Sequence, residues 1–208
     1  MTRWLGVALL PCDDDLRSAL RVQNEVRGPD GLRPALSVDG NLPHVTVFQG
    51  PFVDSLDPRQ ELDRISASVD LPPSVRLRFA GIVYQATGWV FLSLERPPLL
   101  EKLQQATLAI LDPLLDREAF DSSKDTSAFT DSEQASYARY GYRYTGDAYA
   151  PHITLGRAED EVAREIVRSA PDRTSVPQTW TFDRLSFYTM GEQGAHSETL
   201  ALWHLDPS

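Results

Sequence analysis

The sequence contains the same short pattern twice: Pro-His-Val-Thr-Val at 43–47 and Pro-His-Ile-Thr-Leu at 151–155. The second copy begins about half a chain length after the first, in a chain of 208 residues. This spacing predicts two similar halves that face each other. Alternate side chains of a β-strand point to the same face, so each copy, read as a strand, presents its histidine and its threonine together. The pattern therefore predicts a cleft between the halves that holds two imidazoles and two hydroxyls.

The segments around the two copies have the same predicted order: strand, helix, motif strand, helix, strand. In the first half, the acidic run 13–15 suits the first turn of a helix, and the Gly- and Pro-rich stretch 28–42 is a loop that leads to the motif. The other elements of the first half are predicted at 5–10, 57–69 and 76–85. The second half follows the turn Thr87-Gly88, with elements predicted at 89–95, 99–114, 151–155, 162–170 and 179–189, and a last strand at 199–205.

This order predicts an α+β fold: a two-lobed internal duplication, with antiparallel-rich sheets lining a central cleft and helices outside. We expect a single domain over 1–208, with interleaved lobes of approximately 1–88 and 89–208. The stretch 116–147 is the irregular connection that leads to the second motif. It is polar and then rich in tyrosine, and a connection of this length is often a lid or a binding loop. Its tyrosines either stack on a nucleobase or sugar, or pack the loop onto the domain.

Composition limits the partners that the chain can have. The formal net charge is −10 and the sequence pI is about 4.8, so the long-range field repels polyanions, and we expect no broad binding of duplex nucleic acid. A small nucleotide or one RNA end is compatible with this charge. No apolar run reaches the length of a membrane span, and the single cysteine, Cys12, cannot form an internal disulfide. We expect a cytoplasmic monomer without a membrane partner.

Paired histidines suit phosphoester chemistry, because a neutral imidazole takes a proton from water while a protonated one gives a proton to the departing oxygen. The threonine hydroxyls would hold the phosphoryl oxygens. A single His-x-Thr in an apolar strand would more often be structural, but two copies among only four histidines favour a functional pair. His196 and His204 have no such threonine and are interpreted as structural. No metal site is expected, since the sequence has neither a cysteine pair nor a His-Glu-x-x-His motif.

The repeated His-x-Thr, half a chain apart, resembles the signature of the two-histidine (2H) phosphoesterase superfamily, which includes 2′,3′-cyclic nucleotide phosphodiesterases and the bacterial 2′-5′ RNA ligase family. The resemblance implies metal-independent hydrolysis of a 2′,3′-cyclic phosphate, carried by a nucleotide, ADP-ribose cyclic phosphate or an RNA end, without a cofactor. His44, Thr46, His152 and Thr154 would be catalytic, with the acid and base roles open. Two alternatives are 2′-5′ ligation or 2′-5′ phosphodiester cleavage within the same family, and a non-catalytic nucleotide-binding module.

Three further residues are predicted to bind substrate. Strict alternation places Phe48 on the face of His44, where its ring would floor the cleft, and places Gly156 on the face of His152, where it would leave room for a ligand. Arg157 resembles a basic residue of the RNA ligase branch and would contact phosphate if the strand ends at Gly156. Tyr188 alternates with core positions on its strand and is predicted to contact phosphate or ribose.

Overall fold

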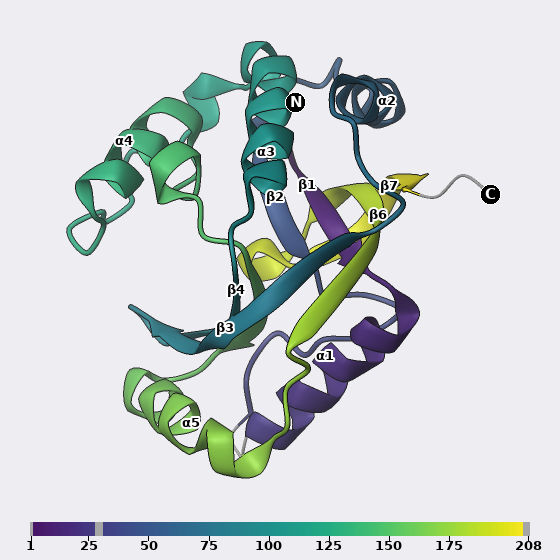
Figure 1. Ribbon diagram of the computed structural model, residues 1–208. Coiled ribbons are helices and arrows are strands. Elements are labelled where there is room, and N and C mark those ends of the chain that lie inside the picture. Colours follow the sequence, from purple (N-terminus) through teal and green to yellow (C-terminus); the bar gives the residue numbers. More distant parts are fainter. Residues whose placement is uncertain (1, 28–30, 206–208) are drawn as a thin grey trace.

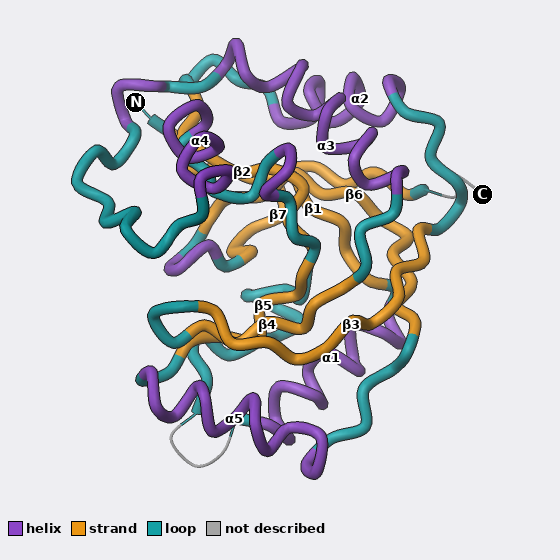
Figure 2. Tube along the Cα trace, turned by 60° about the vertical axis from the view of Figure 1, so that its left-hand side comes forward, coloured by secondary structure: helices purple, strands orange, loops and turns teal. Residues whose placement is uncertain are grey.

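The computed structural model describes residues 2–27 and 31–205, so residues 28–30 of the predicted loop lie outside the described part. Seven strands form one antiparallel sheet, and helices cover it on the outside (Figures 1 and 2). The α+β fold class is thereby confirmed. In chain order the elements are β1 (Arg3–Pro11), α1 (Asp13–Val26), β2 (Val45–Phe52), α2 (Pro58–Ser68), β3 (Val75–Gln85), β4 (Trp89–Leu94), α3 (Pro98–Leu111), α4 (Asp131–Tyr140), β5 (His152–Arg157), α5 (Asp160–Arg173), β6 (Thr179–Met190) and β7 (His196–His204).

Local sequence signals account for the ends of the helices. Asp57 caps α2, since its carboxylate accepts hydrogen bonds from the backbone N–H groups of Arg59 and Gln60, and Pro58 occupies the first turn. Three aspartates, at 13–15, fill the first turn of α1, where they complement the helix dipole. These two helices begin where the sequence predicts.

The strand pairings run round a ring. The order of the sheet is β1-β2-β5-β4-β3-β6-β7, and β6 also pairs with β1. The six strands from β1 to β6 therefore form a closed ring, and β7 pairs with β6 beside this ring. All of these pairs are antiparallel. Between β2 and β5 the register contains one pair, Val45 opposite Ile153. This single contact lies inside the two sequence motifs, so the motif strands meet there and diverge on either side.

The two halves of the chain exchange their third strands. β3, from the first half, pairs with β4 of the second half, and β6, from the second half, pairs with β1 of the first. The helices are exchanged as well: α1 packs with α5 on one side, while α3 packs with α2 on the other and lies against β2 (Figure 1). Each half therefore supplies a strand and a helix to the sheet of the other half.

Two elements differ from the sequence-based expectation. The stretch 116–147 contains the helix α4, and α5 continues through Pro171 to Arg173 instead of ending before it. Pro171 lies in the last turn of α5, so its missing N–H removes one helical hydrogen bond and its ring crowds only the carbonyl of Val167. Within the described residues, no helix is long and apolar enough to cross a membrane.

Candidate functional site

The two motifs present their polar side chains on the same side of the Val45–Ile153 contact. Val45 and Ile153 are fully buried and point into the core. Thr46 and Thr154, one residue further along each strand, are only partly buried, which shows that they lie on the opposite face. The structure therefore brings the two predicted His-x-Thr motifs together.

Both motif histidines are oriented in the same way by the backbone that precedes them. Nδ1 of His44 lies 2.8 Å from the carbonyl oxygen of Leu42, and Nδ1 of His152 lies 2.6 Å from that of Ala150. A carbonyl oxygen only accepts hydrogen bonds, so Nδ1 must carry the hydrogen in each ring. Nε2 then keeps its lone pair in the neutral imidazole and is the atom available for proton transfer.

The surroundings of the two rings differ. His44 is 8% exposed, and its Nε2 lies 3.5 Å from the hydroxyl of Tyr188. His152 stacks on Phe91, with ring centroids 4.0 Å apart and an angle of 19° between the ring planes. The edge of Tyr144 approaches the same imidazole at 5.3 Å. One histidine thus has a polar partner at Nε2, and the other is held between aromatic rings.

Burial lowers the pKa of both imidazoles from the ordinary value of 6.5 to about 4. The bonds to Leu42 and Ala150 oppose this effect, whereas a charge on His44 and the guanidinium of Arg143 lower the pKa of His152 further. Both imidazoles are neutral at pH 7 in the free protein, and an anion bound between them would raise both pKa values.

Each motif strand contains a β-bulge one residue after its threonine. Val7 and Ala8 on β1 pair with Phe48 and Thr46, which leaves Val47 without a partner in the register. On β4, Val90 and Phe91 pair with Gly156 and Thr154, which leaves Leu155 in the equivalent position. A bulge adds one residue and shifts the alternation of side chains beyond it. The internal repeat therefore extends to an irregularity that both motif strands share.

The bulges change which residues accompany the threonines. Phe48 is fully buried and packs edge-on against Phe52, Tyr140 and Tyr142, so its ring belongs to the core and not to the face of His44. Beyond the bulge, the partly buried Gln49 takes that face.

Gly156 likewise leaves no room for a ligand. A Cβ atom there would lie 2.8 Å from Cβ of Leu32 and 3.0 Å from the backbone nitrogen of Arg33, and the residue has a φ of +128°. Glycine is required because the segment that contains Leu32 approaches closely.

The other two predicted substrate residues lie on either side of the motifs. Arg157 is exposed and pairs across the sheet with Trp89, over whose ring its guanidinium lies at 5.8 Å, while its Nε donates to the carbonyl of Thr87. Because the bulge shifts the alternation of side chains, Arg157 lies on the face of Thr154 even though β5 continues to Arg157 and does not end at Gly156. Tyr188 is fully buried, so its position is beside His44 rather than at the surface.

Two buried glutamines, which the sequence analysis did not single out, hold the bulges. Gln104 on α3 donates to the carbonyl of Val47, at 2.9 Å, and Gln23 on α1 donates to that of Leu155, at 2.6 Å. Both amides are 2% exposed, and each makes two further hydrogen bonds to backbone groups. Each helix therefore supports the motif strand of the other half of the chain.

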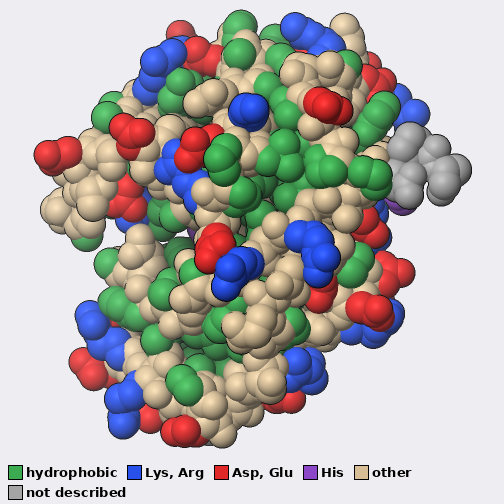
Figure 3. Space-filling model, in the orientation of Figure 1, with side chains coloured by type: hydrophobic (Ala, Val, Ile, Leu, Met, Phe, Trp, Pro, Cys, Tyr) green, Lys and Arg blue, Asp and Glu red, His purple; other side chains and the backbone are tan. Residues whose placement is uncertain are grey.

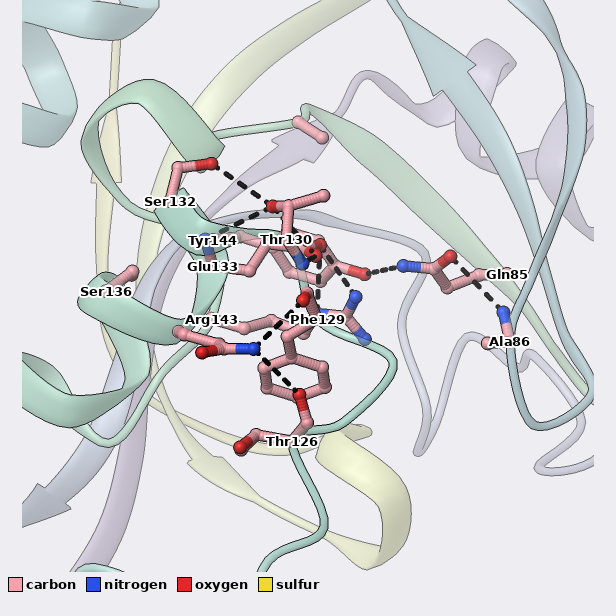
Figure 4. Close-up of polar contacts among 12 residues, drawn as sticks. Gln85, Ala86, Thr126, Phe129, Thr130, Ser132, Glu133, Ser136, Arg143 and Tyr144 are labelled. Atoms are coloured by element: carbon pink, nitrogen blue, oxygen red, sulfur yellow. Dashed lines mark hydrogen bonds and ion pairs between the residues drawn. The ribbon is translucent and has the colours of Figure 1, made fainter.

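Arg143 joins separate parts of the stretch 116–147 to one another, and Tyr144 ties the stretch to β3 (Figure 4). The guanidinium of Arg143 donates to Glu133 on α4 and lies over the rings of Phe129, at 4.0 Å, and Tyr144, at 4.8 Å. The hydroxyl of Tyr144 accepts a hydrogen bond from Gln85 at the end of β3. Tyr142, Tyr144 and Tyr149 are buried, which shows that these tyrosines pack the segment onto the domain.

A sequence signal for α4 exists. Thr130 and Glu133 form a capping box, in which the threonine hydroxyl accepts from the N–H of Glu133 and the glutamate accepts from the N–H of Thr130. Gly141 then ends the helix in the left-handed conformation.

The surface is indented between the part that carries α4 and the part that carries α5 (Figure 3). A separate pocket of about 480 Å³ is lined by residues of α1 and β7, among them Asp13 and Leu202, and includes neither motif histidine. Among the residues that the structure describes, no group of three or more histidine, cysteine or acidic side chains is placed to hold a metal ion.

Comparisons with known proteins agree with this architecture. Over 97–98% of both chains, the fold is similar to those of E. coli LigT complexed with phosphate (TM-score 0.54, 15% identity), LigT complexed with 3′-AMP (0.54, 14%) and TT0787 of Thermus thermophilus (0.54, 17%). No curated protein matches the sequence. A family model described as the 2′-5′ RNA ligase superfamily matches residues 21–194. The chain therefore belongs to the 2′-5′ RNA ligase superfamily, whose members are two-histidine phosphoesterases.

Proposed function

We propose that the chain hydrolyses a 2′,3′-cyclic phosphate to a phosphomonoester without a metal ion, as one 2H phosphoesterase-like unit over 1–208. The observation that carries the proposal is the matched pair of imidazoles. Each has Nδ1 committed to a backbone carbonyl, which leaves Nε2 free for proton transfer. The meeting of the motif strands at Val45 and Ile153 supports a single site that both Nε2 atoms serve.

In the proposed reaction, Nε2 of one histidine takes a proton from water as the water oxygen attacks phosphorus. Nε2–H of the other histidine gives a proton to the ribose oxygen as the phosphorus–oxygen bond breaks. Each such proton transfer typically contributes about 10²- to 10⁴-fold in rate. The hydroxyls of Thr46 and Thr154 donate hydrogen bonds to the phosphoryl oxygens, where charge accumulates in the transition state.

The low pKa of both imidazoles, about 4, fits an anionic substrate. The free site carries no charge at neutral pH, and a bound phosphodiester would supply the negative charge that stabilises the one imidazolium the mechanism needs. LigT, which has a similar fold, binds phosphate and 3′-AMP, and these are the kinds of group that a cyclic-phosphate hydrolase contacts. The net charge of −10 favours a small nucleotide or a single RNA end over long RNA.

The test is a turnover screen, with and without EDTA, of 2′,3′-cyclic mononucleotides, ADP-ribose cyclic phosphate, 2′-5′ oligoadenylate and RNA ending in a cyclic phosphate. We expect hydrolysis of a cyclic phosphate at the same rate in EDTA, and a rate about 10²- to 10⁴-fold lower with the His44→Ala variant. Joining of cyclic-phosphate RNA to a 5′-hydroxyl, or cleavage of the 2′-5′ bond alone, would assign the site to the alternative activities. Tight binding of nucleotide without any turnover would identify a binding module.

A further inference from the structure

His196 is the first residue of β7, and its side chain is fully buried. Its imidazole lies flat on the ring of Tyr188, with centroids 4.3 Å apart and an angle of 13° between the planes. Nε2 lies 3.0 Å from the hydroxyl of Ser186, whereas Nδ1 is buried and has no hydrogen-bond partner among the described residues. A buried nitrogen of this kind costs free energy, so the position of the ring calls for an explanation beyond its own hydrogen bonds.

The ring of Tyr188 connects His196 to the first motif. Its hydroxyl lies 3.5 Å from Nε2 of His44 and 3.2 Å from Oε1 of Gln49. Burial raises the pKa of Tyr188 above its ordinary value, so the hydroxyl keeps its hydrogen. The protonated hydroxyl of Tyr188 therefore lies between the motif histidine and Gln49.

The strand on the other side of Tyr188 leaves the ring little freedom. Gly6 pairs with Tyr188 across the sheet, and a Cβ atom at Gly6 would lie 2.5 Å from the tyrosine ring. The ring thus occupies the space that a side chain on β1 would fill. Together, the Gly6 backbone and the His196 imidazole fix where the hydroxyl lies.

A second connection runs through the backbone. The carbonyl of His196 accepts a hydrogen bond from the N–H of Leu42 at 3.4 Å, and the N–H of His196 donates to Oδ1 of Asn41 at 3.3 Å. The carbonyl of the same Leu42 accepts from Nδ1 of His44. His196 therefore contacts Tyr188, which lies at Nε2 of His44, and Leu42, whose carbonyl lies at Nδ1 of His44.

We propose that His196 is a positioning residue for His44, and that its imidazole holds the Tyr188 hydroxyl at Nε2 of His44. This inference rests on the proposed function, since it concerns the reacting histidine. A hydroxyl between His44 and Gln49 serves both protonation states: it donates to neutral Nε2, or turns its hydrogen to Gln49 and accepts from protonated Nε2. Tyr144 also approaches His152, at 5.3 Å, but its hydroxyl accepts from Gln85, and no hydrogen bond joins it to His152 among the described residues.

The experiment compares His196→Ala, which removes the flat ring, with His196→Phe, which keeps it. Because misplacement of a reacting group is costly, we expect His196→Ala to lower kcat on the order of ten- to a hundredfold with little change in KM. His196→Phe should retain most of the wild-type kcat. His204→Ala, on the exposed face of the same strand, is the matched control and should leave kcat unchanged.

Titration of the His44 imidazole by NMR gives a readout that does not need turnover. The titratable groups around this ring are Tyr188, His196 and His152. We expect the midpoint to rise toward its ordinary value in His196→Ala, where water reaches the ring, and to stay in place in His196→Phe. Without turnover in the wild type the proposed function fails, while the titration still tests the positioning.

Two outcomes would overturn the inference. One is a folded His196→Ala protein with the wild-type kcat and the wild-type titration midpoint for His44. The other applies if His196→Ala does not fold: Tyr188→Phe keeps the ring and removes only the hydroxyl, so a wild-type kcat in that variant would show that nothing is positioned through Tyr188. We expect it to lower kcat, and the double variant with His196→Phe to be no worse than Tyr188→Phe alone.

Discussion

Each motif histidine donates from Nδ1 to a backbone carbonyl, and each has a lowered pKa. Because the two residues are equivalent in these respects, we expect their removal to have equal effects. His44→Ala and His152→Ala should each reduce kcat by about 10²- to 10⁴-fold, because each removes one of two proton transfers. Both proteins should keep the wild-type melting temperature within a few degrees. His204→Ala serves as the control, since His204 is exposed and lies outside both motifs. Full activity of either motif variant would refute the paired mechanism.

Substitution of the motif threonines distinguishes a catalytic role of their hydroxyls from a structural one. Thr46→Val and Thr154→Val keep the β-branched shape and remove only the hydroxyl. Loss of one preorganised donor to a phosphoryl oxygen typically costs on the order of 3 kcal/mol, about a hundredfold in rate, and this loss falls on kcat more than on KM. Steady-state kinetics and thermal melts of both variants measure the two quantities. Stable variants with unchanged kcat would leave the hydroxyls as parts of the sheet alone.

The lowered pKa of the imidazoles also predicts how anion binding depends on pH. A bound dianion raises the pKa of both rings above the free value of about 4, so binding takes up protons. Affinity must then rise as pH falls below the raised pKa, by up to about tenfold per pH unit for each proton taken up, and level off below the free pKa. Sulfate is a suitable probe in calorimetry because it stays doubly charged over this range. The double variant His44→Ala/His152→Ala should show a flat profile, and a flat profile in the wild type would contradict the electrostatic account.

At the scale of single elements, the bulges and their glutamines form a repeated support. Gln104→Leu would leave the carbonyls of Val47 and Tyr144 and the N–H of Gly146 without their buried partner. A buried polar group left unsatisfied costs about 1–3 kcal/mol, so we expect a clear fall in the free energy of unfolding in urea. Gln105→Leu, at the next and exposed position of α3, should cost almost nothing. Equal stability of the two variants would show that the amide does not hold the bulge.

The sequence predicts the order of strands and helices because that order depends on local periodicity and on helix capping. The motif residues are predictable for the same reason, since they recur as a pattern. The bulge at Val47 is not, because it exists only in the register with β1, and this is why Phe48 lies in the core. His196 follows a Gly-rich turn and reads as part of a loop, although β6 makes it the start of a strand. The capping box at Thr130 could have predicted α4.

At the scale of the whole molecule, the exchange of strands makes the halves depend on each other. Without 88–208, β3 loses its partners β4 and β6, and β1 loses its partner β6. Without 1–87, β4 loses β3, and β6 loses β1 and β3. Unpaired buried strands and exposed apolar faces are unstable in water.

This dependence predicts that residues 1–87 and 88–208, produced separately, have no cooperative thermal transition, and that mixing them from denaturant restores both the transition and turnover. The cut falls in the turn between β3 and β4, where Thr87 and Gly88 both have positive φ. Circular dichroism melts of each half and of the mixture decide the question. A cooperative transition in either half alone would show two lobes that fold independently, at about 1–88 and 89–208, in place of one interleaved domain.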